Sequence, residues 1–318
     1  MAFKFVYVLV SGENDYYAEQ AAVSMYSLRR HNPDSHITLM TDGNTLNLLE
    51  GNRSLVKNYV NEFVTVETPS EFTPKERSRF LKTSIRQNIE GDFLFLDCDT
   101  IIAGDLSVCE ELDCEIGAVL DCHQITSKNG QFLKYLAITK RTVEEYDRYF
   151  NGGVLFVRDT DNARKFYEEW HMLWSESRSQ YGITFDQPAL ALADAACGHL
   201  VKEIDGRFNC QIVLPGAKRY LFDALVIHYM SDLLCFSSFP LKNKKLLATV
   251  REEGITAEIE YIVCNPLLAF LEDSCILGGE ELEIYLSPVM ILGRKLSRDF
   301  KWLNKVVRFF YRLAGYKI

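Results

Sequence analysis

The alternation of short apolar segments with helix-patterned segments constrains the fold of this chain most. Residues 3–11 and 36–41 are short runs rich in β-branched or aromatic residues, which predict buried strands. Residues 18–31 between them have helical spacing and end at an Asn-Pro pair. The segment DFLFLD at 92–97 is apolar throughout its interior, as in a strand covered on both faces. This order predicts an α/β fold with a mostly parallel sheet.

A helix start is encoded between Thr73 and Glu76. Thr73 suits the N-cap, Pro74 the first helical position and Glu76 the third, so Thr73 and Glu76 can form a capping box. We expect this helix to run to about Asn88. Further strands are predicted at 115–121, 153–157 and 224–228, and further helices at 142–149, 161–176 and 186–197.

Composition excludes several classes of protein. The 318 residues are 47% hydrophobic and 25% charged, which excludes disorder or a coiled coil as the main state. A net charge of −9 argues against nucleic acid as a partner. The nine cysteines contain no CxxC pair, which favours a reducing compartment and predicts a cytoplasmic protein. The chain has no run of 18 apolar residues, and its first residues fit a buried strand better than a signal peptide.

Two acidic pairs have the pattern Asp-x-Asp. Asp97 and Asp99 follow the apolar strand at its carboxyl end, where ligands of open α/β sheets bind. Two carboxylates at this spacing can share a hard cation such as Mg²⁺ or Mn²⁺, which also binds diphosphate oxygens. In the second pair, Asp159 and Asp161, the chain enters a helical pattern, so helix capping accounts for it. The chain after Asp99 continues extended, so capping does not account for the first pair.

Three other polar positions each leave two interpretations open. The segment NGG at 151–153 is either a turn whose glycines supply positive φ or a place where the backbone approaches a ligand closely. Asp186 is either a helix N-cap or, together with Gln187, part of a ligand cleft. His228 ends a predicted strand, where most histidines are structural and a minority bind ligands.

In this order the segments resemble glycosyltransferase family 8, whose members have a GT-A fold and transfer a sugar from a nucleoside diphosphate donor. The resemblance begins at VYVLVSGENDYYAEQ and continues through SRFLKTSIRQNIEGDFLFLDCDTII, IGAVLDCH, FNGGVLFV, FDQPAL and VIHY. It implies a GT-A catalytic domain over residues 1–230 and a smaller helical segment over 231–318.

The matching residues fall into three groups. The implied ligands of a Mn²⁺ or Mg²⁺ cofactor are Asp97, Asp99 and His228. The implied contacts of a UDP-sugar donor are Tyr17 on the uracil base, Asn14, Asp15, Arg79, Asn151 and Gly152. The implied catalytic residues, beside the donor sugar and its anomeric carbon, are Asp121, Asp186 and Gln187.

One segment departs from the family pattern. The family follows its histidine with a glycine, a lysine-proline pair and a tryptophan, and the lysine clamps the diphosphate. Here no lysine stands at that distance, Lys242 lies farther on, and Ser237 and Ser238 offer only neutral hydrogen bonds. A retaining reaction, as in the family, requires no strong general base. An inverting reaction requires a carboxylate, for which Asp186 and Asp121 are the candidates, and both outcomes stay open.

The end of the chain differs in charge from the rest. Residues 290–318 carry eight basic side chains and one acidic side chain, so their net charge is +7 and that of residues 1–289 is −16. Within this tail, Trp302, Val306 and Phe309 recur at helical spacing. The pattern is typical of an amphipathic helix on an anionic membrane, and a helix packed on the catalytic domain is the alternative.

Together these observations predict a metal-dependent glycosyltransferase that moves a hexosyl group from a UDP-sugar to a glycan or glycolipid acceptor. Retention, a role in bacterial surface polysaccharide or lipopolysaccharide synthesis, and peripheral attachment to the inner face of the cell membrane complete the prediction. One alternative is a catalytically silent protein that binds nucleotide sugars or a membrane surface. Another is a sugar-1-phosphate nucleotidyltransferase, for which SGENDYY lacks the glycine-rich, arginine-containing phosphate loop.

Overall fold

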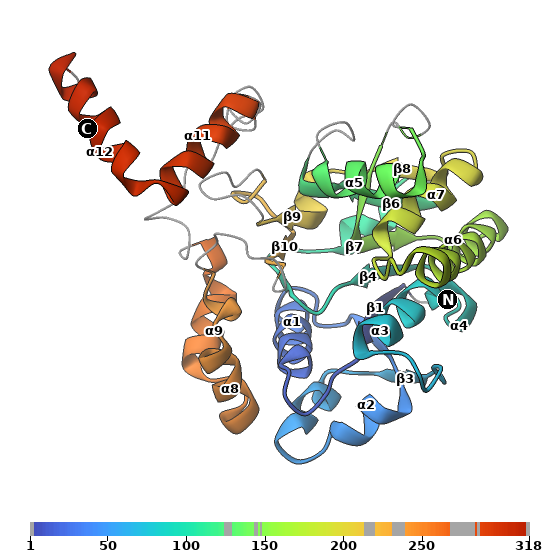
Figure 1. Ribbon diagram of the computed structural model, residues 1–318. Coiled ribbons are helices and arrows are strands. Elements are labelled where there is room, and N and C mark those ends of the chain that lie inside the picture. Colours follow the sequence, from blue (N-terminus) through green and yellow to red (C-terminus); the bar gives the residue numbers. More distant parts are fainter. Residues whose placement is uncertain are drawn as a thin grey trace.

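A seven-stranded sheet with helices on both faces forms the centre of the molecule (Figure 1). The computed structural model describes residues 3–123, 129–142, 146, 148–212, 220–230, 239–267, 284 and 287–315. The large sheet has the order β3-β2-β1-β4-β7-β6-β8, with β1 (Lys4–Leu9), β2 (His36–Thr41), β3 (Glu62–Thr65), β4 (Phe93–Leu96), β6 (Ile116–Leu120), β7 (Phe150–Val157) and β8 (Val201–Glu203). A smaller sheet has the order β5-β10-β9, with β5 (Thr100–Ile102), β9 (Cys210–Gln211) and β10 (Val226–His228).

The large sheet is parallel except at β7. Strands β3, β2, β1 and β4 are parallel, whereas β7 is antiparallel to both of its neighbours, β4 and β6. The prediction of an α/β fold with a mostly parallel sheet is therefore confirmed. Because β7 is reversed, its first residues lie at the edge where β4 ends, with Val154 paired to Leu96.

Helices pack on both faces of the sheet, because alternate residues of a strand point to opposite faces. The helices of the described residues are α1 (Tyr17–His31), α2 (Gly43–Leu48), α3 (Pro74–Thr83), α4 (Ile85–Asn88), α5 (Gly130–Thr139), α6 (Asp161–Tyr181), α7 (Gln187–Ala196), α8 (Lys244–Glu253), α9 (Ala257–Cys264), α11 (Pro288–Asp299) and α12 (Lys301–Leu313). Tyr7 and Leu9 of β1 pack in one cluster with α1, and Val6 and Val8 pack in another with α3, α6 and α7.

Thr73 and Glu76 form the predicted capping box at the start of α3. The predicted continuous helix to Asn88 is wrong, because it breaks at Ser84 (φ −106°, ψ 12°) into α3 and α4. The hydroxyl of Ser84 donates to Leu81 O, an alternative to helical backbone pairing that serine offers.

Two other predicted boundaries differ from the structure. The strand predicted at 153–157 begins at Phe150, so the NGG segment lies inside β7. The described residues of the helix predicted at 142–149 are not helical, and the helix of this region is α5 instead. Tyr146 and Tyr149 pack their rings on Phe132 of α5, so burial of these aromatic side chains decides the local structure.

Helices α8 and α9 pack against α1 and the small sheet. Val23 of α1 shares a hydrophobic cluster with Ile227 of β10, Val250 of α8 and Ile259 of α9. This cluster contains residues from both sides of position 230, and the division into domains at that position stays a prediction.

Helices α11 and α12 form a separate arm (Figure 1). Among their described side chains, none is buried. Across the described residues, no helix combines the length and the hydropathy that crossing a membrane requires.

Candidate functional site

Asp97, Asp99 and His228 meet at the carboxyl edge of the large sheet. Asp97 and Asp99 lie between β4 and β5, and β10 pairs with β5 so that His228 lies opposite Thr100. One ligand atom from each of the three side chains lies within 4.8 Å of the others. His228 Nε2 is 3.3 Å from Asp99 Oδ1 and 4.0 Å from Asp97 Oδ2. Two carboxylates and an imidazole at these distances fit a divalent cation such as Mn²⁺.

Gly153 allows β7 to pass directly against this cluster. A Cβ atom at this position would lie 2.3 Å from His228 Cε1 and 2.8 Å from Asp97 Oδ2, so only glycine fits. The backbone N–H of Asp97 donates to Gly153 O at 2.8 Å. Neither Gly152 nor Gly153 has a positive φ. The turn interpretation of the NGG segment is therefore wrong, and close backbone approach is the reason for the glycine at 153.

A chain of amide side chains holds His228. His228 Nδ1 lies 3.2 Å from Asn209 Oδ1, and Asn209 Nδ2 donates to Asn151 Oδ1 at 2.9 Å. Asn151 Nδ2 in turn donates to Asp121 Oδ1 at 2.9 Å. All four side chains are buried. With Nδ1 donating to Asn209, Nε2 faces the two aspartates, which is how a metal-binding histidine is usually oriented.

Sequence reasoning missed Asn209. It lies in a short 3₁₀ turn, Gly206–Asn209, just before β9, and no motif marks it. Its one sequence signal is its position before a short strand that pairs with β10, where its side chain can reach His228.

Arg79 and Lys82 bring Asp186 to the same site. Arg79 Nε is 2.9 Å from Asp186 Oδ1, and Lys82 Nζ is 3.3 Å from both Asp186 Oδ2 and Asp97 Oδ1. The two cations are three residues apart on α3, so they project from one face of that helix. Asp186 occupies the N-cap position of α7, but its side chain makes no capping hydrogen bond. Its side chain therefore belongs to the site, and the capping interpretation is wrong.

The charged groups of the site shift one another's ionisation. Burial opposes the charged form of His228, but Asp99 and Asp97 outweigh it, and the pKa of His228 is raised. Burial raises the pKa of the Asp97 carboxyl, although Lys82 and His228 oppose that effect. Asp186 is buried too, yet Lys82 and Arg79 lower the pKa of its carboxyl. The aspartates are thus held beside positive groups inside the protein.

Gln187 connects α7 to β7. The backbone N–H of Gly152 donates to Gln187 Oε1 at 3.2 Å. Asn151 and Gly152 therefore lie between the Asp121 side and the Gln187 side of the site. The residues predicted to bind the metal, to line the donor sugar or to act in catalysis therefore lie close together in the structure.

The residues assigned to the nucleotide lie on the loop between β1 and α1 and at the first position of α1. Asp15 accepts a hydrogen bond from Gly12 N at 2.6 Å and pairs with Arg53 at 3.4 Å. Asn14 is exposed on the same loop, and Tyr17, the first residue of α1, is exposed too. Arg251 of α8 donates to the backbone oxygens of Glu13 and Asp15 in this loop and pairs with the buried Glu19 of α1 at 2.8 Å. Because Tyr7 pairs in parallel with Leu96, this loop leaves the sheet at the edge where Asp97 lies.

The segment after His228 is described only in part. Lys242 Nζ donates to Met230 O at 3.2 Å, two residues beyond His228. Ser237 and Ser238 lie outside the described residues.

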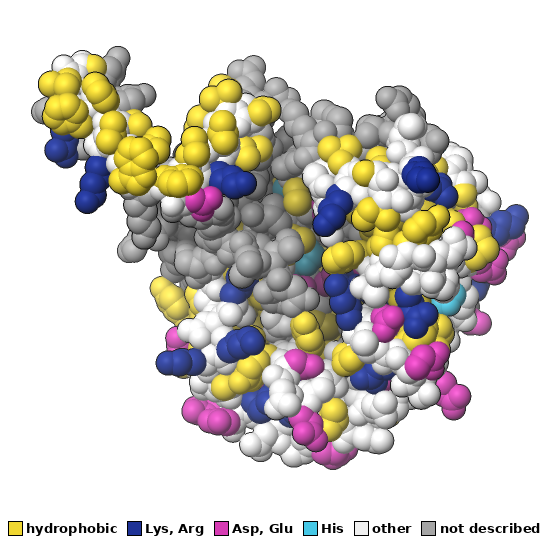
Figure 2. Space-filling model, in the orientation of Figure 1, with side chains coloured by type: hydrophobic (Ala, Val, Ile, Leu, Met, Phe, Trp, Pro, Cys, Tyr) yellow, Lys and Arg dark blue, Asp and Glu magenta, His cyan; other side chains and the backbone are white. Residues whose placement is uncertain are grey.

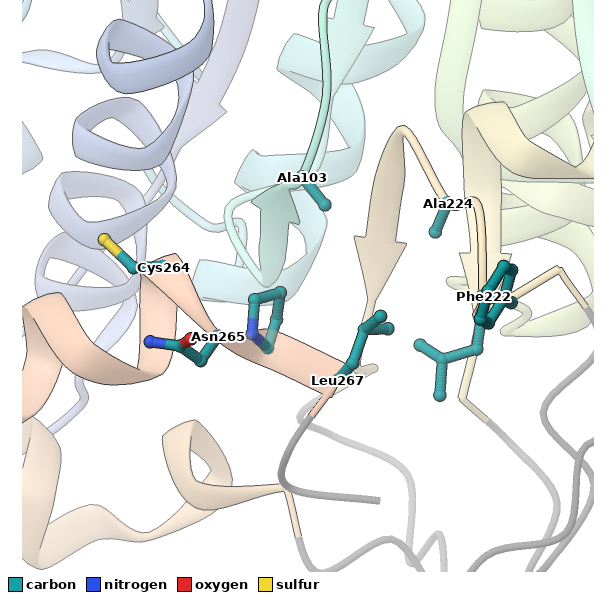
Figure 3. Close-up of a pocket in the computed structure, with 8 residues that line it drawn as sticks. Ala103, Phe222, Ala224, Cys264, Asn265 and Leu267 are labelled. Carbon is teal, nitrogen blue, oxygen red and sulfur yellow. The ribbon is translucent and has the colours of Figure 1, made fainter. Parts of the chain in front are cut away.

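A pocket of about 330 Å³ lies at the other end of the small sheet (Figure 3). Ala103, Phe222, Ala224 and Leu267 are among the residues that line it. Since β5 and β10 are antiparallel and His228 is opposite Thr100, this end of the sheet faces away from His228. Among the described residues, those that line the pocket include no acidic or histidine side chain, so this pocket differs in place and in chemistry from the cluster above.

Comparison with family models decides the class of protein. The model described as glycosyl transferase family 8 matches residues 8–233. The chain belongs to this family. It is therefore a glycosyltransferase, and membership implies a nucleotide-sugar donor and a glycan acceptor. No curated protein sequence matches the chain.

The chain is similar to several solved structures of glycosyltransferases. The galactosyltransferase LgtC, in a complex with donor and acceptor sugar analogues, has a TM-score of 0.52 and 18% identity over 77% of this chain and 95% of its own. At that identity the likeness shows a shared GT-A fold. Mouse xyloside xylosyltransferase 1 has a TM-score of 0.47 and 12% identity over 72% of this chain and 97% of its own. GlyE of Streptococcus pneumoniae TIGR4 has a TM-score of 0.49 and 18% identity over 84% of this chain and 64% of its own.

Proposed function

We propose that this glycosyltransferase moves a hexosyl group from a UDP-sugar to a glycan or glycolipid and requires Mn²⁺, or Mg²⁺, for the reaction. The observation that carries the proposal is the cluster of Asp97, Asp99 and His228, with Arg79, Lys82 and Asp186 beside it. The three side chains suit the metal as ligands, because carboxylate and imidazole groups bind Mn²⁺ well. Gly153 also fits, since a Cβ at this position would fill space beside Asp97 and His228.

Each group of residues has a task in this reaction. A divalent cation, when bound, neutralises the charge that develops on the departing diphosphate. Asn209 keeps His228 Nε2 directed at the cation position. Gln187 and Asn151, which are fixed on α7 and β7, line the place of the donor sugar. Holding the sugar and the acceptor in one geometry lowers the entropic part of the barrier.

We also propose that the reaction proceeds with retention. Inversion requires a carboxylate that accepts the proton of the acceptor hydroxyl. Asp186 pairs with two cations and the pKa of its carboxyl is lowered, which makes it a poor base. The two carboxylate oxygens of Asp121 accept hydrogen bonds from Asn151 and Asn129, at 2.9 and 2.6 Å. The carboxylate oxygens of both residues are thus engaged in ion pairs or hydrogen bonds inside the protein, which supports a mechanism without a strong base.

A screen of nucleotide sugars tests the proposal. Thermal unfolding is measured with Mn²⁺ and each of a panel of UDP- and GDP-sugars, since a bound donor stabilises the folded state by mass action. We expect one or a few UDP-sugars to raise the unfolding temperature and to be hydrolysed slowly to UDP. Stabilisation by UDP-sugars with no hydrolysis and no transfer would favour the catalytically silent alternative. Stabilisation by GDP-sugars alone would contradict the donor class.

We propose further that α11 and α12 attach the enzyme to an anionic membrane. Most of their described apolar side chains are exposed, including Trp302 at 62%, Phe309 at 60% and Phe310 at 61%. Figure 2 shows hydrophobic side chains gathered along both helices, with Lys and Arg side chains to one side of α12. An exposed apolar face beside basic residues matches the interface of an anionic bilayer. The alternative of a helix packed on the catalytic domain has no support among the described side chains of the arm, since none is buried.

Membrane attachment supports a particular acceptor. An enzyme held at the inner face of the cell membrane meets lipid-linked glycans, the intermediates of bacterial surface polysaccharide and lipopolysaccharide synthesis. We propose this setting, with the enzyme cytoplasmic and peripheral. Transfer to lipid-linked acceptors in vesicles, and none to the same glycans free in solution, is the expected result. Equal transfer to both would contradict it.

A further inference from the structure

Lys82 is a buried cation that lies between the carboxylates of Asp97 and Asp186. Its side chain is 5% exposed. Its ammonium lies 3.3 and 3.4 Å from the two carboxylate oxygens of Asp97, and 3.3 Å from Asp186 Oδ2. It also lies 5.0 Å from the centre of the Phe95 ring. The ammonium thus connects a carboxylate of the metal cluster with the carboxylate at the start of α7.

This ammonium competes for the carboxylate that a metal ion needs. A divalent cation at the cluster would bind Asp97, the same group that Lys82 contacts. Two positive charges on one carboxylate repel each other, and screening is weak at a site where Lys82 and His228 are buried. The remaining partner of Lys82, Asp186, already pairs with Arg79. A metal ion that enters without another anion therefore leaves Lys82 poorly compensated.

A diphosphate supplies the missing anion. Metal-bound diphosphate brings several negative oxygens to the cluster. The Cβ position of Gly152, in the segment assigned to the donor sugar, would lie 3.6 Å from Lys82 Nζ, so the ammonium borders the place of the donor. With the diphosphate present, Lys82 can exchange Asp97 for a phosphate oxygen and keep a charged partner.

We infer that Lys82 couples metal binding to diphosphate binding: its charge opposes a divalent cation that binds alone and favours the same cation when a nucleoside diphosphate binds with it. The inference rests on the proposed function, because it takes Asp97, Asp99 and His228 as metal ligands. Coupling of this kind is reciprocal, so the metal increases the affinity for the diphosphate by the same factor. Lys82 is a positioning and binding residue that neither the sequence motifs nor the family resemblance assigned.

The test is calorimetric titration of Mn²⁺ into the full chain, with and without saturating UDP. We compare the wild type with Lys82→Met, Lys82→Arg and, as the matched control, Lys75→Met, which removes an exposed lysine from the same helix. We expect Lys82→Met to bind Mn²⁺ alone about tenfold more tightly than the wild type. We expect the gain in Mn²⁺ affinity on adding UDP to fall about tenfold in that variant, and to stay within about twofold of wild type in the other two.

The other possible results distinguish failure of the inference from failure of the proposed function. Weaker binding of Mn²⁺ alone by Lys82→Met, or an unchanged gain on adding UDP, overturns the inference while leaving the proposed function intact. A wild type that binds no Mn²⁺ even with UDP overturns the proposed metal site, and the inference with it. Thermal unfolding checks that each variant is folded, and Lys82→Gln, which is neutral but polar, replaces Lys82→Met if the latter does not fold.

Discussion

The catalytic body, which comprises the described residues 3–267, and the arm formed by α11 and α12 differ in which side chains they expose. In the body, charged and polar groups are buried and paired with one another, as His228, Asn209 and Asn151 show. In the arm, large apolar side chains such as Trp302 and Phe309 are exposed. A buried, paired site can exchange one of its partners for a ligand, whereas an exposed apolar face needs a surface from outside the chain. The two regions should therefore respond to different substitutions, and the predictions below separate them.

The largest effect is expected from the metal ligands. Asp97→Asn and Asp99→Asn each remove a charge from the cluster, and we expect turnover of the donor to fall about a thousandfold, since a metal ion at the leaving group contributes several kcal/mol. Steady-state UDP release with saturating Mn²⁺ measures this. Sedimentation with anionic vesicles should not change. Unaltered activity in both variants would show that a metal ion at this cluster does not take part in the reaction.

Deleting residues 287–318 should have the second largest effect, and on the membrane alone. We expect binding to anionic vesicles to weaken at least about a hundredfold, because the apolar and basic groups of the arm are lost together. Hydrolysis of a soluble donor should stay within about twofold of the full chain, as the described arm residues are not buried in the body. Equal pelleting of the two proteins would reject membrane attachment.

Asn209 tests how the body positions its metal ligand. Asn209→Leu removes the partner of His228 Nδ1 with a side chain of similar size. We expect the affinity for Mn²⁺ in the presence of UDP to fall about 10- to 100-fold, the usual effect of losing such a hydrogen bond. Calorimetry measures it, with Asn162→Leu, an exposed asparagine on α6, as the control. If the two variants behave alike, the hydrogen bond does not orient the histidine.

Single apolar residues of the arm should have smaller effects. Trp302→Ala and Phe309→Ala are each expected to weaken vesicle binding several-fold, by about tenfold at most, because each removes one buried ring from the interface. The unfolding temperature should not change, since both rings are exposed in the free protein. Gly153→Ala in the body is the contrast, because its Cβ would clash with His228 and lower the unfolding temperature. A lower unfolding temperature in the arm variants would show that the arm packs on the body after all.

The smallest predicted effect concerns pH. Burial disfavours the Asp186 carboxylate, but Lys82 and Arg79 lower its pKa below the ordinary value of 3.8. A carboxyl whose pKa is lower in the folded state contributes stability above its unfolded pKa and loses it as pH falls through the folded pKa. The difference in unfolding free energy between wild type and Asp186→Asn should therefore be largest near neutral pH and shrink below about pH 4. Denaturant unfolding at several pH values measures it, and a difference that grows on acidification would contradict the assigned ion pairs.

The sequence predicted the regions where local patterns and burial agree. The strand at 92–97 and the capping box of Thr73 and Glu76 were predicted correctly, because apolar runs and caps are local properties. The Asp97–Asp99 pair, which its spacing marked, lies in one cluster with His228, and its role as a metal site stays a prediction. The reversed direction of β7 could not be predicted, since it depends on how α5 and the preceding chain return to the sheet. Lys82 and Asn209 were missed for the same reason: they reach the site through tertiary contacts, with Asp97 and His228 respectively. The choice between two interpretations of Asp186 also required the position of α3.

We propose above that the cluster of Asp97, Asp99 and His228 holds a divalent cation through which the nucleotide binds. Titration of UDP into the full chain, once with Mn²⁺ and once with EDTA, tests it most directly. We predict that Mn²⁺ increases the affinity for UDP at least about tenfold in the wild type and leaves the affinity of Asp99→Asn nearly unchanged. Equal affinity of the wild type for UDP in Mn²⁺ and in EDTA would contradict the claim.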